Sequence, residues 1–399
     1  MSALSRRRLL AATAGVSAVA AGATVGLPTT AHAAPAVGPT AAPDIEPFHG
    51  PHQGGVATPA QTHARWLAFD LVDDVDRDGL GRLMRLLSDD AERLTAGRGA
   101  LADNEPELAS RPGRLTVTFG VGPGFVERAG AAVPASLRPL PAFTVDRLLP
   151  RWSDGDLVVQ VCGDDPVSLA HASRQITKDT RTFAEPRWVQ RGFLPARAAS
   201  TPDPVTRALA PTPTPRNLFA QVDGTVNPAP GPDLDALVWV DDPQAPWLRG
   251  GTYAVVRRIR MDLDTWDRVG RDGRELAIGR RLDTGAPLTG SHETDPVDLE
   301  AVDSIGLPVI PEFAHVRRAR GDASGPQLLR RGYSYDDDGD AGLVFVSFQA
   351  DVDRQFVPMQ RRLDELDLLN TWTTPVGSTV VAVLPGAERG GWVGETLLS

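Results

Sequence analysis

Strand-like and helix-like segments alternate along this chain of 399 residues, and a similar mixture of strands and helices occurs in each half. In the first half, runs rich in β-branched residues predict strands, and apolar residues at helical spacing predict helices. The predicted strands are 65–71, 114–122 and 156–163, and the helices are 76–96 and 168–179. In the second half the strands are 236–240, 252–261, 342–350 and 378–385, and the helices are 263–271 and 355–369. This alternation predicts an α+β fold with helices packed on one face of a sheet.

A stretch dense in proline and threonine, residues 201–217, separates the two halves. Such a composition is typical of a boundary between domains. We therefore predict an N-terminal domain over 48–205 and a C-terminal domain over 206–399. The two share one plan of elements, without a residue-level repeat.

The first 33 residues are typical of an export signal. Three arginines, Arg6 to Arg8, precede an apolar run rich in alanine, which ends in small residues around Ala33. This pattern predicts cleavage after Ala33 and fits the twin-arginine type, which carries folded proteins and leads out of the cytoplasm to the cell envelope or medium. A retained membrane anchor is the alternative. Residues 34–47 are rich in alanine and proline and predict a flexible leader.

Charge and cysteine content exclude several classes of protein. The net charge of −10 argues against a general nucleic-acid binder. Beyond the export signal, no segment approaches the roughly 20 apolar residues that cross a bilayer, so we expect the mature form not to enter a membrane. Cys162 is the single cysteine of the chain, so an internal disulfide is excluded.

Most histidines of the chain have unremarkable surroundings. His171 lies on a predicted helix among apolar neighbours and is interpreted as a core or surface histidine. His292 lies in a polar loop. His49 and His52 form at most half of a metal site, because no further ligands stand at a suitable spacing.

His315 differs, because arginines surround it in the sequence. They are Arg317, Arg318, Arg320, Arg330 and Arg331. An imidazole that ligates iron, with guanidinium groups beside it for two propionates, is the arrangement that binds an iron porphyrin. A solvated surface histidine explains the same pattern, so both interpretations stay open on the residues themselves.

Many segments in order resemble the dye-decolourising peroxidase family. They include FHGPHQGGVATPAQTHARWLAFDL, DGDLVVQVCGDDP, NLFAQVDGTVNP, WLRGGTYAVVRRIRMDLDTWDR, FAHVRRAR, LLRRGYSYDD and GLVFVSFQADVDRQFVPMQRRLDELDLLNTW. The resemblance runs from about His49 to the C-terminus. Within the family the chain is most similar to the twin-arginine-exported bacterial group, which includes proteins proposed to be deferrochelatases.

The resemblance implies a fold, a cofactor and roles for individual residues. The fold would be two ferredoxin-like domains, each an antiparallel sheet with helices on one face, and one haem b per chain would be held mainly by the second domain. Asp223 would be the distal acid–base residue, Arg330 the distal arginine, and His315 the axial ligand of the iron. The haem edge would contact Gly224, Thr225, Val226 and Arg320, although an Asp-Gly turn also explains Asp223 and Gly224 on composition alone.

Three further points concern residues near the implied site. Ala220 stands where the family's Gly-x-x-Asp-Gly signature has its first glycine, and we expect a negative φ there, since alanine disfavours a positive φ.

Asp351, at the end of a predicted strand, is expected to accept a hydrogen bond from the second ring nitrogen of His315. The alternative is that Asp351 forms a salt bridge at the surface. Trp188, Trp372 and Tyr333 would relay electrons or, in the simpler interpretation, belong to the core, and 335–340 reads as a solvated hairpin turn.

The resemblance implies a haem peroxidase that reduces hydrogen peroxide and oxidises dyes, phenols or a physiological protein partner. One alternative is a deferrochelatase, which releases iron from haem and leaves the porphyrin intact. Another is a haem carrier with incidental peroxidase activity. An oligomer is compatible with all three.

Overall fold

The computed structural model describes residues 44–196, 213–321 and 327–399, and its first half contains every predicted element. The strands are β1 (His63–Leu71), β2 (Thr116–Val121), β3 (Leu157–Gly163) and β4 (Ala184–Phe193), and the long helices are α1 (Arg77–Thr95) and α3 (Pro166–Thr180). The strands pair antiparallel in the order β2-β3-β1-β4. This order, with α1 following β1 and α3 following β3, is the ferredoxin-like arrangement.

Local chemistry explains where the two long helices begin. Asp76 caps α1, since its side chain accepts a hydrogen bond from the Gly79 N–H, and Asp165 caps α3 in the same way. Four of the predicted apolar positions of α1, Leu80, Leu83, Leu87 and Leu94, are buried and join the core under the sheet, whereas Leu86 is exposed. A short helix, α2 (Pro123–Arg128), follows β2.

The second half repeats the arrangement with more interruptions. Its strands are β5 (Thr252–Met261), β6 (Leu329–Arg330), β7 (Tyr333–Asp337), β8 (Asp340–Gln349) and β9 (Thr373–Val383), and they pair antiparallel, with β5 between β9 and β8. The helices are α4 (Pro232–Val238), α5 (Leu263–Trp266), α6 (Arg271–Ile278), α7 (His315–Arg320), α8 (Val357–Leu366) and α9 (Glu395–Leu398). The turn between β7 and β8 is the predicted hairpin, with Asp337 paired to Asp340.

Two predicted elements of this half were wrong in kind or extent. The strand expected over 236–240 is largely α4, because Gly231 and Pro232 start a helix whose Leu234 and Val238, four residues apart, are both buried. The helix expected over 263–271 is the short α5, and a separate helix, α6, begins after Gly270.

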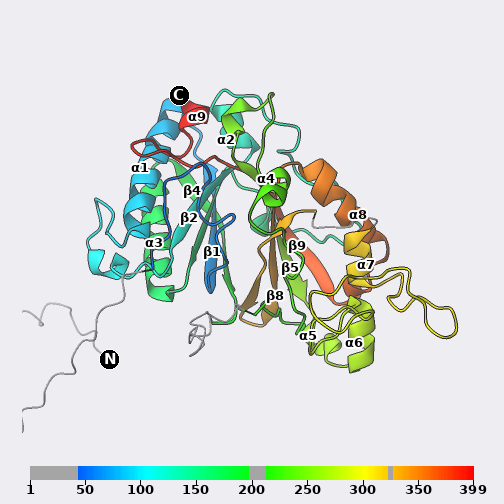
Figure 1. Ribbon diagram of the computed structural model, residues 1–399. Coiled ribbons are helices and arrows are strands. Elements are labelled where there is room, and N and C mark those ends of the chain that lie inside the picture. The colour runs from blue at the N-terminus through cyan, green and yellow to red at the C-terminus, as the bar shows by residue number, and fades with distance from the viewer. Residues whose placement is uncertain (1–43, 197–212, 322–326) are drawn as a thin grey trace, which may run out of the picture. The chain divides into compact units, whose positions relative to one another are not determined.

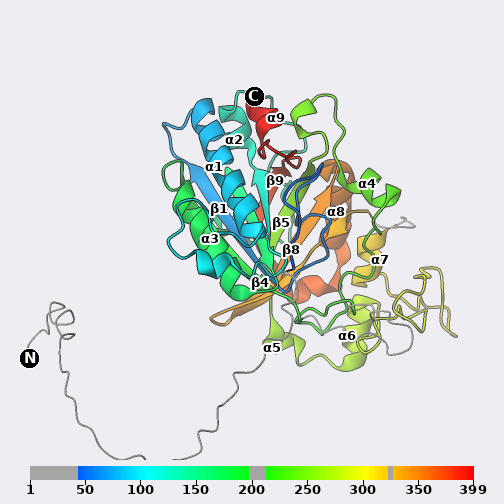
Figure 2. The ribbon, with the colours of Figure 1, turned by 60° about the vertical axis from the view of Figure 1, so that its left-hand side comes forward.

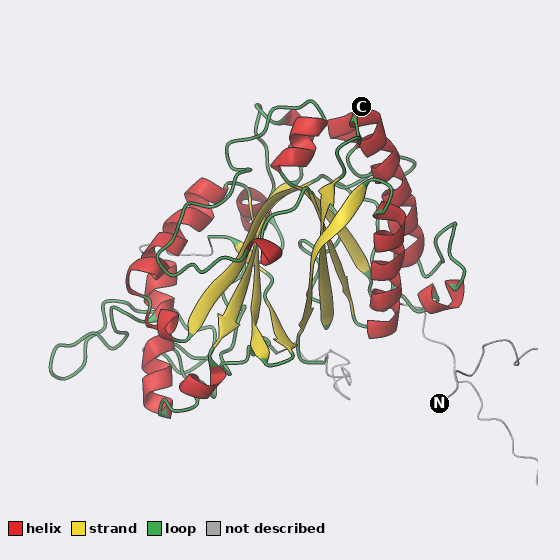
Figure 3. Ribbon diagram, turned by 180° about the vertical axis from the view of Figure 1, so that it is seen from behind, coloured by secondary structure: helices red, strands yellow, loops and turns green. Residues whose placement is uncertain are grey.

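The two sheets are joined into one ring of hydrogen-bonded strands. Strand β2 pairs with β9 through Gly120 and Val121, and β4 pairs with β7 at Phe193. Since β5 also pairs with β8, the order of strands closes on itself. Residues 43–399 form one compact unit. Figures 1 and 2 show α1 and α3 outside the first sheet and α7 and α8 outside the second, and Figure 3 shows the two groups of strands between these helices.

Separate cores fill the two sides of the sheets. Side chains such as Trp66, Tyr333 and Phe348 pack together with Leu234 and Val238 of α4, whereas α1 and α3 cover a larger core that includes Leu67 and Phe119. Tyr333 is fully buried, and Trp188 and Trp372 pack in apolar clusters, which favours the core interpretation for all three.

The end of the predicted flexible leader is held in place. The Asp44 carbonyl accepts a hydrogen bond from the Arg114 N–H at 2.8 Å, and the Glu46 carboxylate pairs with the Arg114 guanidinium at 2.7 Å. The expectation of a loose segment is therefore wrong for residues 44–47. The export signal (1–33), the rest of the leader and the expected domain boundary at 205/206 lie outside the described residues. Among the described helices, none has the length and hydropathy that a membrane span requires.

A buried carboxylate between α1 and α3 makes stability depend on pH. Burial is the largest cause, and together with the neighbouring carboxyl groups of Asp179 and Asp89 it raises the pKa of Asp90 to about 7. The unfolded chain loses this proton at a lower pH than the folded chain, so we expect the free energy of unfolding to fall as pH rises from about 4 to 7. Asp90→Asn is expected to remove this slope and to stabilise the protein by about 1–3 kcal/mol at pH 8.

Chemical denaturation between pH 4 and pH 8 measures this slope. Asp73→Asn is the matched control, because Asp73 is exposed and is not one of the groups that shift the pKa of Asp90. Parallel pH curves for the wild type and Asp90→Asn would contradict the prediction.

Candidate functional site

A cavity of about 240 Å³ lies between the second sheet and the helices α7 and α8. Strand side chains such as Ile259, Leu343 and Phe345 form one side, and Met359 and Leu363 of α8 belong to the other. Most residues of the loop 217–226 also line the cavity. Most of the lining is apolar, and a few charged side chains reach it.

His315 is the first residue of α7 and lines this cavity. Its Nδ1 lies 2.6 Å from Oδ2 of Asp367, whose side chain is almost fully buried. Burial by itself lowers the pKa of His315, but the Asp367 carboxylate outweighs burial and raises the pKa above 6.5. In the neutral imidazole, Nδ1–H donates a hydrogen bond to Asp367, and the lone pair of Nε2 stays available to a metal ion in the cavity.

The expected partner of His315, Asp351, was wrong. Asp351 caps the π-helical turn Val352–Phe356 by accepting from the Arg354 N–H at 3.0 Å, and Ser136 donates to it at 3.4 Å. The acceptor comes instead from the C-terminal end of α8, because α7 packs beside α8. The predicted helix 355–369 included Asp367 as an ordinary last-turn residue. Its helix in fact ends at Leu366, and Asp367 caps the following turn by accepting from Leu369.

Asp223 and Arg330 meet at the cavity as an ion pair. Arg330 Nη1 lies 3.1 Å from Asp223 Oδ1, and both side chains are roughly a quarter exposed, at 28% and 27%. Arg330 belongs to β6, while Asp223 lies in the loop that follows Pro215, to whose carbonyl its N–H donates at 2.9 Å. The structure therefore brings together three residues that stand up to 107 positions apart in the chain.

The residues after Asp223 also line the cavity, as the resemblance implied. Gly224 has a φ of 123°, which glycine adopts without strain. Gly224, Thr225 and Val226 all contribute to the wall. The Thr225 hydroxyl donates to Oε1 of Glu293 at 2.9 Å, and Thr214 donates to the same oxygen, so Glu293 anchors this loop although no sequence pattern singled it out.

Ala220 has a φ of 63°, so the expectation of a negative φ was wrong. A tight turn requires this conformation: the Ala220 N–H donates to the Asn217 carbonyl at 2.9 Å, and the Asn217 side chain accepts from the N–H groups of Phe219 and Gln221. Alanine is strained in the left-handed region. The strain explains why a glycine suits this position.

Ala220→Gly is expected to stabilise the protein by about 1 kcal/mol, because it relieves this left-handed strain. Thermal unfolding measures the effect. Ala236→Gly, in the short helix α4, is the control and should destabilise, since glycine is a poor helix former. A lower melting temperature for Ala220→Gly would contradict the prediction.

Several guanidinium groups reach the cavity. Arg280, Arg320 and Arg330 line it, and burial lowers the pKa of Arg280, which Arg330 and Arg320 lower further. Arg257 of β5 is 1% exposed and pairs with Asp146, and within the described residues its Nε and Nη1 have no hydrogen-bond partner. An apolar cavity with one imidazole and buried cations fits an iron porphyrin with two carboxylates. The sequence did not single out Arg257 or Arg280, because both lie within ordinary strand and loop patterns.

The other histidines singled out by the sequence lie elsewhere. His171 is buried and its Nε2 lies 2.7 Å from Asp103, which confirms a core histidine. His49 and His52 contact backbone carbonyls through Nδ1, and His52 also stacks on Trp239, so they do not combine into a metal site. The side chain of His292 is 82% exposed.

Comparisons with known proteins agree with this geometry. The family model described as Dyp-type peroxidase, N-terminal, matches residues 53–194, and the C-terminal model of the same family matches residues 214–388. A dye-decolorizing peroxidase from Thermobifida fusca is 40% identical over 367 residues, which cover 87% of this chain and 83% of that protein. A deferrochelatase from Escherichia coli (strain K12) is 34% identical over 422 aligned residues, covering 99% of this chain and 97% of that protein.

Solved structures extend the similarity to the whole fold. A DyP-type peroxidase from Cellulomonas bogoriensis is 50% identical, with a TM-score of 0.83 over 90% of this chain and 100% of that one. DtpA from Streptomyces lividans, solved as an oxyferrous/water mixed complex, is 40% identical with a TM-score of 0.82 over 90% and 98%. These matches span both sheets and the cavity between the second sheet and its helices. The chain therefore belongs to the DyP-type peroxidase family.

Proposed function

We propose that this haem peroxidase reduces hydrogen peroxide in the cavity beside His315, with Asp223 moving the proton and Arg330 stabilising negative charge. The observation that carries the proposal is the Asp223–Arg330 ion pair, which lines the same cavity as an imidazole held by a buried carboxylate. The reductants would be small aromatic molecules such as dyes and phenols, or a protein partner.

Each residue has a role that its contacts support. When bound, haem supplies the iron at which the peroxide O–O bond is broken and to which reductants return electrons. Asp223 takes a proton from one peroxide oxygen and gives it to the other, which leaves as water. Arg330 stays protonated, so it stabilises the negative charge that develops and orients the carboxylate. Asp367 accepts a hydrogen bond from the Nδ1–H of His315, which makes Nε2 a stronger electron-pair donor to a metal ion.

The carboxylates of haem would be held by cations that line the cavity. Arg320 and Arg280 belong to this group, and Arg257 contributes guanidinium nitrogens that have no partner in the described part of the chain. Gly224, Thr225 and Val226 would lie against the haem edge.

Release of iron from haem is the second candidate, because the chain covers nearly the full length of curated deferrochelatases. One experiment separates the two. Purified protein is supplied with haem, hydrogen peroxide and a phenol or anthraquinone dye, and dye oxidation and porphyrin fluorescence are followed together. Dye oxidation without fluorescent free porphyrin supports the proposal. Free porphyrin in stoichiometric amounts favours the deferrochelatase. The absence of both oxidised dye and free porphyrin favours a haem carrier.

We also propose that residues 1–33 direct folded, haem-loaded protein through the twin-arginine route. The support is the arginine group ahead of the apolar run. Replacement of Arg6 and Arg7 by lysine should keep the precursor in the cytoplasm, which fractionation and N-terminal sequencing of the exported protein can measure. Unchanged export would overturn this part of the proposal.

A further inference from the structure

The side chain of Asn227 bonds both polar groups of the Arg330 backbone. Asn227 Nδ2 donates to the Arg330 carbonyl at 2.8 Å, and the Arg330 N–H donates to Asn227 Oδ1 at 2.9 Å. A carboxamide that pairs in this way imitates the neighbouring strand of a sheet. The residue therefore joins the loop that carries Asp223 directly to the strand that carries Arg330.

This contact matters because β6 has two residues and little support of its own. On one side Leu329 and Arg330 pair with Phe348 and Ser347 of β8. On the other side the Asn227 carboxamide takes the place of a further strand. Asn227 is itself placed by a turn, since its N–H donates to the Gly224 carbonyl at 3.2 Å, so the spacing from Asp223 to Asn227 is fixed locally.

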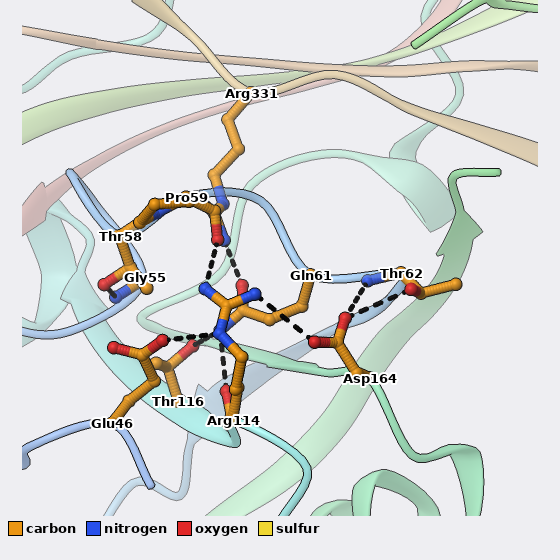
Figure 4. A network of polar contacts seen from close by, with 10 residues as sticks. All are labelled: Glu46, Gly55, Thr58, Pro59, Gln61, Thr62, Arg114, Thr116, Asp164 and Arg331. Carbon is orange, nitrogen blue, oxygen red and sulfur yellow. Dashed lines mark hydrogen bonds and ion pairs between the residues drawn. The ribbon is translucent and has the colours of Figure 1, made fainter. Parts of the chain in front are cut away.

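The next residue, Arg331, fixes the same strand from the first half of the chain. Successive side chains of a strand point to opposite faces, and the Arg331 side chain is buried away from the cavity. Its guanidinium donates to the Thr58 carbonyl and to Oε1 of Gln61. Figure 4 shows these contacts continuing through Gln61 to Arg114, which pairs with Glu46 and Asp164.

The ion pair itself is too weak to set this geometry. An attraction between two side chains that are each roughly a quarter exposed is screened by water and loses rotamer entropy, so it contributes little. Hydrogen bonds to the backbone place the Cα atom of Arg330, and the position of the Cα atom determines where the guanidinium can reach. Small errors in such placement cause large losses of rate.

We propose that Asn227 is the positioning residue of the distal pair: it holds the Arg330 backbone at the distance from which Arg330 reaches Asp223, while Arg331 anchors the opposite side of the strand. The inference rests on the proposed function for its effect on peroxide chemistry. Its structural part, the protection of the Arg330 backbone, does not depend on that function.

The test compares Asn227→Leu, which has a similar size and no hydrogen bonds, with Asn227→Asp, which keeps the acceptor for the Arg330 N–H and loses the donor. Hydrogen exchange of peptides that contain residues 327–335 is measured on the haem-free protein, where the Arg330 amide should exchange at least about tenfold faster in Asn227→Leu than in the wild type. Asn227→Asp should lie between the two. Asn104→Leu, an exposed asparagine in the first half, is the control for the substitution.

Two measurements on haem-loaded protein follow. Fluoride binding, read from the visible spectrum, should weaken about tenfold in Asn227→Leu, because a bound anion accepts a hydrogen bond from a correctly placed distal guanidinium. The peroxide reaction should slow about ten- to a hundredfold. In an Arg330→Leu background, Asn227→Leu should add almost nothing, since its effect passes through Arg330.

The outcomes separate the inference from the proposed function. Unchanged exchange of the Arg330 amide in both Asn227 variants overturns the inference, and so does an undiminished effect of Asn227→Leu in the Arg330→Leu background. Faster exchange and weaker fluoride binding support it, even where Arg330→Leu leaves the peroxide reaction unchanged. That last result would count against the proposed function of Arg330 only.

Discussion

Asp223→Asn and Arg330→Leu are each expected to slow the reaction of the ferric protein with hydrogen peroxide by about a hundred- to a thousandfold. Asparagine cannot carry the proton between the two peroxide oxygens, and leucine cannot stabilise the negative charge that develops. Because the two side chains form one ion pair at 3.1 Å, the double variant should be little slower than the slower single variant. Stopped-flow mixing with peroxide measures these rates from the change in the visible spectrum.

Two exposed residues near the same sheet provide matched controls for these substitutions. Asp264→Asn and Arg260→Leu change the same residue types outside the cavity and should leave the rate within about twofold of the wild type. Haem content must be equal in all samples. A wild-type rate in Asp223→Asn would contradict the assignment of the proton carrier, whatever the result for Arg330.

His315→Ala is expected to weaken haem binding by more than about a hundredfold, and Asp367→Asn by about ten- to a hundredfold. The first change removes the nitrogen that would ligate iron, and the second replaces the charged acceptor, 2.6 Å from Nδ1, by a neutral and weaker one. Titration of haem-free protein with haem, followed by absorbance, gives both affinities. Free imidazole added to His315→Ala should restore part of the affinity, since it can occupy the space that the side chain leaves.

His292→Ala is the control for this second prediction, because its side chain is largely exposed and lies outside the cavity lining. It should bind haem as the wild type does. Full affinity in His315→Ala would mean that another residue ligates the iron.

The regular elements could be predicted because their patterns are local. The leucines of α1 and the β-branched runs of β3 and β5 show their periods within a single segment. The segment 236–240 misled because its apolar run fits a strand, whereas Pro232 and the buried pair Leu234 and Val238 select a helix. That choice depends on what the segment packs against, which a local pattern does not contain.

Some residues of the site could likewise be predicted from local motifs, and others could not. The resemblance led to Asp223, Arg330 and His315, which line one cavity, because each lies in a recognisable motif. It did not lead to Asp367, since the acceptor is selected by the packing of α7 beside the end of α8. The φ of Ala220 was also missed: the Asn217 side chain closes the turn around it, and such a contact becomes visible only with coordinates.

Because the ring of strands is closed, the folding of each half of the chain depends on the other half. The pairings of β2 with β9 and of β4 with β7 mean that either half, expressed by itself, would expose the strand edges and apolar faces that its neighbour covers. The residues expected to do the chemistry all come from the second half. Next to Arg330, however, the Arg331 side chain donates hydrogen bonds to Thr58 and Gln61 of the first half. A shortened protein made from residues 214–388 would thus keep the side chains that we propose for catalysis and lose the contacts that position them.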